Sequence, residues 1–245
     1  MILFENCANS PQSCIEAESG GAHRIELCAG LPEGGTTPSL GMVKVALREV
    51  GIPIFPIIRP RAGDFVYSEL EVKQMLSDMY AFRELGVAGF VFGALTASGM
   101  LDSEINHRLL RAAEGLPVTL HRAFDMSADL EVALEQAIDL GFTRVLTSGG
   151  QPSALLGADM IRKLRQKADG RIIVMAGCGI TAENAADLVA RTGVTEIHGT
   201  LQSMVTSPAT HLYSDIARPS RPEIIPCDYP QTDASKVQKL INSFK

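Results

Sequence analysis

The chain has 245 residues, of which 46% are hydrophobic and 20% are charged, as in an ordinary globular protein. Its formal net charge of -6, with no cluster of lysine and arginine, argues against non-specific binding of nucleic acid. No apolar run approaches the ~20 residues that a membrane-spanning helix needs, so we expect no membrane partner.

The first predicted element is a strand at 2–7. The chain start has no basic region and reaches an acid at Glu5, which does not fit a secretory signal. From there, short apolar runs alternate with helical patterns that end in glycine, because a helix commonly ends with a residue at positive φ. These runs predict eight strands, at 2–7, 24–28, 52–58, 89–92, 117–121, 144–147, 171–175 and 195–198.

The predicted helices also carry start signals. Ser68 and Glu71 fit a capping box. Pro11 and Pro38 suit the first position of a helix, where the missing N–H costs nothing. Four further helix caps are predicted at Asp102, Ser127, Ser153 and Thr181.

Eight strand–helix units in a chain of this length predict one TIM-barrel domain over residues 1–245. A doubly wound open sheet is the alternative, but it would more often have six or seven strands and a Gly-rich first turn. Residues 200–232 hold five of the 13 prolines and no clear periodicity. This segment predicts a long loop that serves as a lid, an interface arm or a partly disordered connection. A closing helix follows at 233–244.

Polar residues gather where the predicted strands end, which is where a barrel places its active site. Because side chains alternate along a strand, Glu5 lies on one face with Cys7, and Glu26 with Cys28. Buried charges are costly unless they are paired, so these acids are candidates either for catalysis or for a structural network with arginines. The same alternation turns five further side chains inward, namely Arg59, Thr119, His121, Glu196 and His198.

The segment 57–65 ends an apolar run in two arginines and an acid. Arg59 and Arg61 suit a carboxylate or phosphate, because each guanidinium offers planar, bidentate donors. The alternative is a surface pair between an arginine and Asp64, which stabilises little.

His121 is a candidate general acid or base, with Asp125 orienting its imidazole. A structural histidine is the alternative. Gly177 and Gly179 follow strand seven and Gly199 follows strand eight, where barrels often bind phosphate through backbone N–H groups. Tight turns that need glycine for backbone reasons are the alternative there.

The five cysteines are scattered, odd in number and without a Cys-x-x-Cys pair, so neither a disulfide framework nor a zinc knuckle fits. Reduced thiols in the cytoplasm are expected. Adjacent strands lie only ~4.8 Å apart, so inward thiols of Cys7 and Cys28 could share a soft ion such as Cu(I). Two buried cysteines acting as small hydrophobic residues are the alternative.

Several stretches together resemble the CutC family, at 20–28, 33–39, 58–65, 91–96, 121–126, 146–154 and the Gly177 loop. The resemblance implies a TIM barrel that forms homo-oligomers in the cytoplasm. It also implies copper tolerance and Cu(I) binding, with Cys7 and Cys28 as ligands. Two residues depart from the family pattern: Ala62 replaces a glycine, and Cys178 replaces the middle glycine of a Gly-Gly-Gly turn.

We therefore predict a Cu(I)-binding protein of copper homeostasis. The alternative is a barrel enzyme (a lyase, aldolase or isomerase) acting on a small phosphorylated or carboxylated metabolite, so enzyme status and substrate stay open. Such an enzyme would draw its catalytic groups from Glu5, Glu26, Arg59, Arg61, Asp64 and His121.

Overall fold

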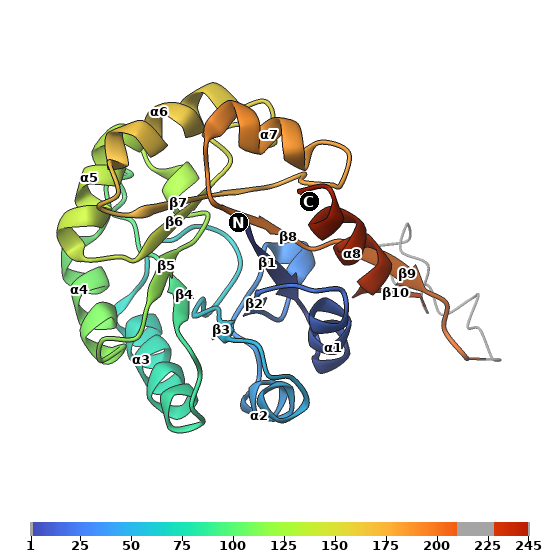
Figure 1. Ribbon diagram of the computed structural model, residues 1–245. Helices are drawn as coiled ribbons and strands as arrows, with labels where there is room; N and C mark the ends of the chain where they lie inside the picture. The colour runs from blue at the N-terminus through green and yellow to red at the C-terminus, as the bar shows by residue number, and fades with distance from the viewer. Residues whose placement is uncertain (1, 210–227, 245) are drawn as a thin grey trace, which may run out of the picture.

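The computed structural model describes residues 2–209 and 228–244, and its main feature is a ring of parallel strands surrounded by helices (Figure 1). The barrel strands are β1 (Leu3–Ala8), β2 (Arg24–Leu27), β3 (Ile54–Pro56), β4 (Phe90–Phe92), β5 (Val118–Leu120), β6 (Arg144–Thr147), β7 (Ile173–Gly177) and β8 (Glu196–Gly199). The helices are α1 (Pro11–Ser19), α2 (Leu40–Glu49), α3 (Glu69–Glu84), α4 (Ser103–Ala112), α5 (Leu130–Leu140), α6 (Ala158–Ala168), α7 (Ala185–Thr192) and α8 (Ala234–Asn242), with short 3-10 turns η1 (Leu31–Glu33) and η2 (Phe124–Met126).

The strands form a nearly closed barrel. Their order in the sheet is β3-β2-β1-β8-β7-β6-β5-β4, with every pairing parallel. The two ends of this order meet through the backbone, where the Ile58 N–H donates to the Val91 carbonyl over 2.8 Å. The predicted TIM barrel is confirmed, with each predicted strand present and its ends shifted by a few residues.

Alternation along the strands separates two apolar regions. Ile25 and Leu27 of β2 join the large core that also contains helix residues such as Val43 and Met75. The opposite face of the strands points into the barrel, where Cys7 and Cys28 form a small apolar cluster together with Phe55, Ile57 and Val91.

The helix caps are partly those predicted. Ser68 and Glu71 form the capping box of α3, Ser10 caps α1 ahead of Pro11, and Asp102 caps α4. The other four predicted starts are wrong. α2 begins after Ser39, so that Pro38 lies outside it; Asp129 caps α5; and α6 and α7 follow Gly157 and Asn184 without a side-chain cap.

The physical reason is that the predicted caps serve neighbouring turns. Ser127 ends η2, and its hydroxyl donates to the Phe124 carbonyl over 2.7 Å. The N–H of Thr181 donates to the Asn184 side chain over 2.9 Å, in the turn before α7. A short polar residue near a helix start can therefore form a hydrogen bond with several nearby groups and does not always cap the helix.

The segment 200–232 contains two strands that the sequence did not predict. β9 (Gln202–Val205) pairs in antiparallel fashion with β10 (Tyr229–Thr232), and residues 210–227 lie outside the described part of the chain. α8 follows at the position of the predicted closing helix and packs against α1. A Cβ at Gly20 would lie 2.5 Å from the Val237 Cβ, so glycine permits this close approach. No helix in the described ranges is long and apolar enough to cross a bilayer.

Candidate functional site

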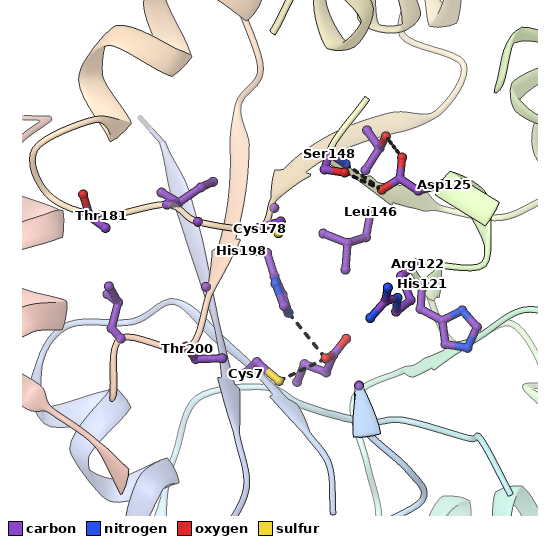
Figure 2. Close-up of a pocket in the computed structure, with 18 of the residues that line it drawn as sticks. Cys7, His121, Arg122, Asp125, Leu146, Ser148, Cys178, Thr181, His198 and Thr200 are labelled. Atoms are coloured by element: carbon purple, nitrogen blue, oxygen red, sulfur yellow. Dashed lines mark hydrogen bonds and ion pairs between the residues drawn. The ribbon is translucent and has the colours of Figure 1, made fainter. Parts of the chain in front are cut away.

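A pocket of about 880 Å³ opens at the carboxyl-terminal end of the barrel (Figure 2). Its walls come from the loops after β5, β6, β7 and β8, and α8 contributes part of the rim. Cys7, Glu26 and His198 line it from the ends of β1, β2 and β8. Both its place and its size fit a small-molecule site, which in proteins occupies roughly 300–1,000 Å³.

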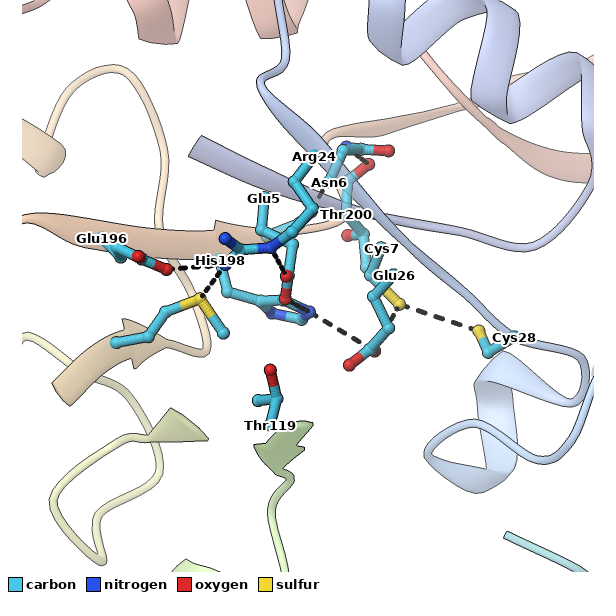
Figure 3. A network of polar contacts seen from close by, with 12 residues as sticks. Glu5, Asn6, Cys7, Arg24, Glu26, Cys28, Thr119, Glu196, His198 and Thr200 are labelled. Carbon is cyan, nitrogen blue, oxygen red and sulfur yellow. Dashed lines mark hydrogen bonds and ion pairs between the residues drawn. The ribbon is translucent and has the colours of Figure 1, made fainter. Parts of the chain in front are cut away.

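Three side chains gather at the base of this pocket, Cys7, Glu26 and His198, and Cys28 is buried beside Cys7. We call these four residues the floor cluster (Figure 3). The Cys7 thiol donates to Glu26 Oε1 over 3.2 Å and lies 3.7 Å from the Cys28 sulfur. His198 Nε2 lies 3.4 Å from the same Glu26 oxygen. Potential ligand atoms of Cys7, Glu26 and His198 all lie within 4.8 Å of one another. This is a donor set that a metal ion could use.

The floor cluster holds an ion pair beside the neutral thiol of Cys7. Burial alone would raise the pKa of Glu26, but His198 lowers it below its ordinary value. Burial alone would lower the pKa of His198, but Glu26 and Glu5 raise it. The hydrogen bond to Cys28, burial and the Glu26 charge together hold the pKa of the Cys7 thiol well above its usual range. Cys7 is therefore a thiol at neutral pH until a cation replaces its proton.

A second group of charges lies deeper in the barrel, and we call Glu5, Arg24, Arg144 and Glu196 the ion-pair layer. Arg24 binds Glu5 and also donates to Glu196 over 2.6 Å, and Arg144 donates to Glu196 over 3.0 Å. The two acids raise the pKa of Arg24 although burial alone would lower it. Glu5 thus pairs with Arg24, and not with Arg59 or Arg61 as the structural alternative expected.

Neither Arg24 nor Arg144 is among the site residues predicted from the sequence. Arg24 stands two residues before Glu26 and so shares its inward face, a signal that strand alternation contains. Arg144 opens β6, where no neighbouring acid in the sequence marks it. His198 was expected to point inward but was not assigned to the site. The parallel register, which pairs it with Glu5, brings it over Glu26.

The loop after β3 places the two predicted anion-binding arginines outside the pocket lining. Arg59 is buried and donates to the carbonyls of Glu33, Gly35 and Gly63, while its guanidinium stacks on Phe65. Arg61 is partly exposed and pairs with Asp64 and with Glu71 of the α3 capping box. Arg59, Arg61 and Asp64 therefore contact this loop and its neighbours, as in the surface-pair alternative, and do not line the pocket.

The expectation that Asp125 orients His121 is wrong. Asp125 instead accepts hydrogen bonds from the N–H groups of Ser148 and Gly150, over 2.7 and 3.0 Å, and from the Thr147 hydroxyl (Figure 2). The donors in this loop are thus satisfied by a carboxylate of the chain itself.

His121 is buried in the pocket wall without a carboxylate partner at hydrogen-bond distance among the described residues. Its Nδ1 accepts from the Ala123 N–H over 3.3 Å, and its ring packs against Phe65. Burial lowers the pKa of His121 to about 3, so the ring is neutral at physiological pH. A neutral, poorly basic imidazole fits the structural alternative better than general-base chemistry.

The predicted glycines do line the pocket. Gly177, Gly179 and Gly199 are part of its wall. A Cβ at Gly177 would lie 2.5 Å from Leu146 Cδ1, so a larger residue there would require the Leu146 side chain to shift. Cys178 and Gly179 follow with φ of 81° and 71°, and a positive φ is unusual for a residue with a Cβ.

Comparison with known proteins gives one consistent result. The model of the CutC family matches residues 2–203. A family protein CutC of Porphyromonas gingivalis is 48% identical over 241 residues, which cover 98% of this chain and 97% of the relative. The human copper homeostasis protein cutC homolog is 45% identical over 239 residues, which cover 98% and 88%.

Solved structures agree with these relatives. A CutC copper homeostasis protein from Streptococcus agalactiae superposes with a TM-score of 0.78 at 39% identity, covering 82% of this chain and 99% of that one. An aldolase, QR15, reaches a TM-score of 0.58 at 14% identity, covering 79% and 88%. The second likeness shows a shared fold alone.

Proposed function

The chain belongs to the CutC family, and on that premise we propose that it binds Cu(I) through Cys7 and Cys28 as part of copper homeostasis. The observation that carries this proposal is the separation of 3.7 Å between the two sulfur atoms. A metal–thiolate bond is about 2.3 Å long in the zinc case, so both sulfurs can reach one ion without moving the strands. Thiolates favour soft ions such as Cu(I).

The surroundings of the thiols also suit a cation. Glu26 accepts from Cys7, and its charge would be offset by an ion that replaces the thiol proton. His198 lies on the other side of Glu26 and offers imidazole, which is a further ligand type for copper. The names of the relatives, in particular the human copper homeostasis protein cutC homolog, support the same assignment.

The test is a competition titration of the purified chain against a chromophoric Cu(I) chelator under anaerobic conditions. Wild type should take one Cu(I) per chain, and the Cys7→Ser, Cys28→Ser double variant should lose that binding. Cys178→Ser is the matched control, because Cys178 is exposed and its thiol donates to the Pro152 carbonyl. Undiminished binding in the double variant would exclude this site.

We further propose a cytoplasmic homo-oligomer, since free thiols are stable in a reducing compartment and the family resemblance implies self-association. Sedimentation at micromolar concentration should show a species larger than a monomer. A monomer alone would contradict this part of the proposal.

A second candidate function is favoured by the pocket. A cavity of about 880 Å³ above the floor cluster is more than a two-thiol copper site needs. It would suit an enzyme acting on a small anionic metabolite, with Glu26 and His198 as the groups nearest to the substrate. Screening metabolites for thermal stabilisation of the copper-free protein tests this candidate. A library of sugar phosphates and carboxylates that leaves the melting temperature unchanged would count against it.

A further inference from the structure

The mouth of the pocket carries two cations without an ion pair in the described ranges, Arg122 and Lys239. Arg122 follows β5, Lys239 lies on α8, and both side chains are exposed. A third cation, Lys236, also lines the pocket, but its ammonium donates to the Gln202 carbonyl over 2.6 Å. The cations available to an anion in this pocket are therefore Arg122 and Lys239, and not the arginines of the β3 loop.

The loop after β7 adds backbone donors at the same mouth. Within residues 2–209 and 228–244, no hydrogen bond uses the N–H groups of Cys178, Gly179 or Ile180. All three residues line the pocket, and two of them have positive φ. Successive N–H groups in such a bend form a concavity that binds anions.

The carboxylates near this mouth do not occupy the donors that would bind an anion. Both oxygens of Asp125 are held by the loop 147–150. Glu183 is exposed. A hydrogen bond from Thr181 contributes most to lowering the pKa of Glu183, and the charge of Lys239 contributes less. Among the hydrogen bonds of the described residues, none joins either carboxylate to the N–H groups of the loop 178–180.

The base of the pocket offers a hydrogen-bond acceptor, in contrast to the donors at the mouth. Glu26 is only 5% exposed, yet its Oε2 has no hydrogen-bond partner among the described residues. Its other oxygen faces Cys7 and His198, and Figure 3 shows Oε2 turned away from them. A buried carboxylate oxygen without a partner is rare and indicates a missing donor. A ligand hydroxyl would supply one.

We propose that this pocket binds a small phosphate monoester that carries a hydroxyl group. The phosphate lies at the mouth, against the N–H groups of residues 178–180 and the cation Lys239. The hydroxyl donates to Glu26 at the base. Phosphate fits better than carboxylate, because it offers three acceptor oxygens to these donors. This inference deepens the second candidate function and rests on the pocket being a substrate site.

The test is calorimetric titration of the copper-free full chain with three probes: inorganic phosphate, glycerol 3-phosphate and glycerol. Glycerol 3-phosphate should bind more tightly than inorganic phosphate, and glycerol alone should not bind. Lys239→Ala should weaken both phosphates roughly tenfold, since a charge-assisted hydrogen bond is removed. The matched control is Lys44→Ala on α2, an exposed lysine outside the pocket, which should leave both affinities unchanged.

Two further variants separate this inference from the functions above. Glu26→Met should bind inorganic phosphate as wild type does, while losing the preference for glycerol 3-phosphate. The Cys7→Ser, Cys28→Ser variant should bind phosphate normally even though it has lost copper. Failure of wild type to bind either phosphate, or equal affinity in Lys239→Ala and wild type, would overturn the inference. Since binding is measured without turnover and without copper, neither result depends on the copper proposal or on catalysis.

Discussion

The ion-pair layer and the floor cluster are two sets of buried polar residues at successive levels of the barrel. Glu5, Arg24 and Glu196 each stand two residues before Cys7, Glu26 and His198, so the layer lies one step deeper in the barrel. Among the described residues, Arg24, Arg144 and Glu196 leave no buried side-chain nitrogen or oxygen without a partner, and Glu5 Oε1 is the one such atom of the layer. Glu26 Oε2 and His198 Nε2 of the floor cluster also have no hydrogen bond there. The unpartnered atoms thus lie in the floor cluster and in the one layer oxygen that faces it, 3.8 Å from His198 Nε2.

This difference distinguishes buried residues that pair with one another from buried residues that are available to a ligand. Buried charges that are paired with one another, as on Arg24 and Glu196, offer little to a ligand. Buried polar atoms that face a cavity without partners are costly for folding, and a ligand would satisfy them.

The largest effect should follow Arg24→Met. This change removes the cation shared by Glu5 and Glu196 and leaves their charges buried with less compensation. Breaking such a buried network by removing one partner costs about 3–5 kcal/mol. Urea unfolding followed by circular dichroism should show this loss in the free energy of unfolding. A loss below about 1 kcal/mol would mean that the layer does not stabilise the barrel.

The next effect concerns His198→Gln and its dependence on pH. The raised pKa of His198 contributes stability that is present below its unfolded value, ordinarily 6.5, and is lost as pH rises through the folded value. The lowered pKa of Glu26 contributes stability that is present above its unfolded value, ordinarily 4.5, and is lost as pH falls through the folded value. The copper-free variant should therefore be least stable relative to wild type between these two values, by about 1.5–3 kcal/mol.

Urea unfolding at a series of pH values measures this difference. His107→Gln is the control, because His107 is exposed on α4 and is not part of the floor cluster. A difference that does not change with pH would show that His198 and Glu26 are not an ion pair in the folded state.

A smaller effect is expected in the pH dependence of Cu(I) affinity. Because the pKa of the Cys7 thiol is raised well above its usual range, the ion must displace a bound proton at neutral pH. As the pH is lowered, protons compete with the ion, so the apparent affinity for Cu(I) should fall about tenfold per pH unit for each displaced proton. Chelator competition at several pH values measures the slope. An affinity independent of pH would place the ion elsewhere.

The smallest effect is expected for Arg61→Met in the β3 loop. Arg61 pairs with Asp64 and Glu71, and its side chain is 38% exposed, so the change should cost less than about 1 kcal/mol. It should also leave the affinity for inorganic phosphate unchanged, because Arg61 does not line the pocket. A loss of phosphate affinity in this variant would restore Arg59 and Arg61 as the anion site.

Much of the fold follows from local patterns. Each strand after the first is a short apolar run between a glycine near the end of a helix and a polar loop, and eight strand–helix units in this length favour a barrel. The Glu-x-Cys repeats at 5–7 and 26–28 also decide which face points inward, because a strand alternates with a period of two. These features depend on residues close together in the chain.

The partners of the polar residues were decided by tertiary structure. Barrel closure and parallel register bring His198 to Glu26, and Arg24 and Arg144 to Glu196, across separations that no local pattern encodes. Arg59 was predicted to bind an anion, yet it meets the carbonyls of a loop that folds back over it. The sequence by itself determined the barrel and its inward faces, since strand periodicity and turn residues act locally. Only the folded barrel decided which charges are paired and which face the pocket, because those contacts depend on how distant strands align.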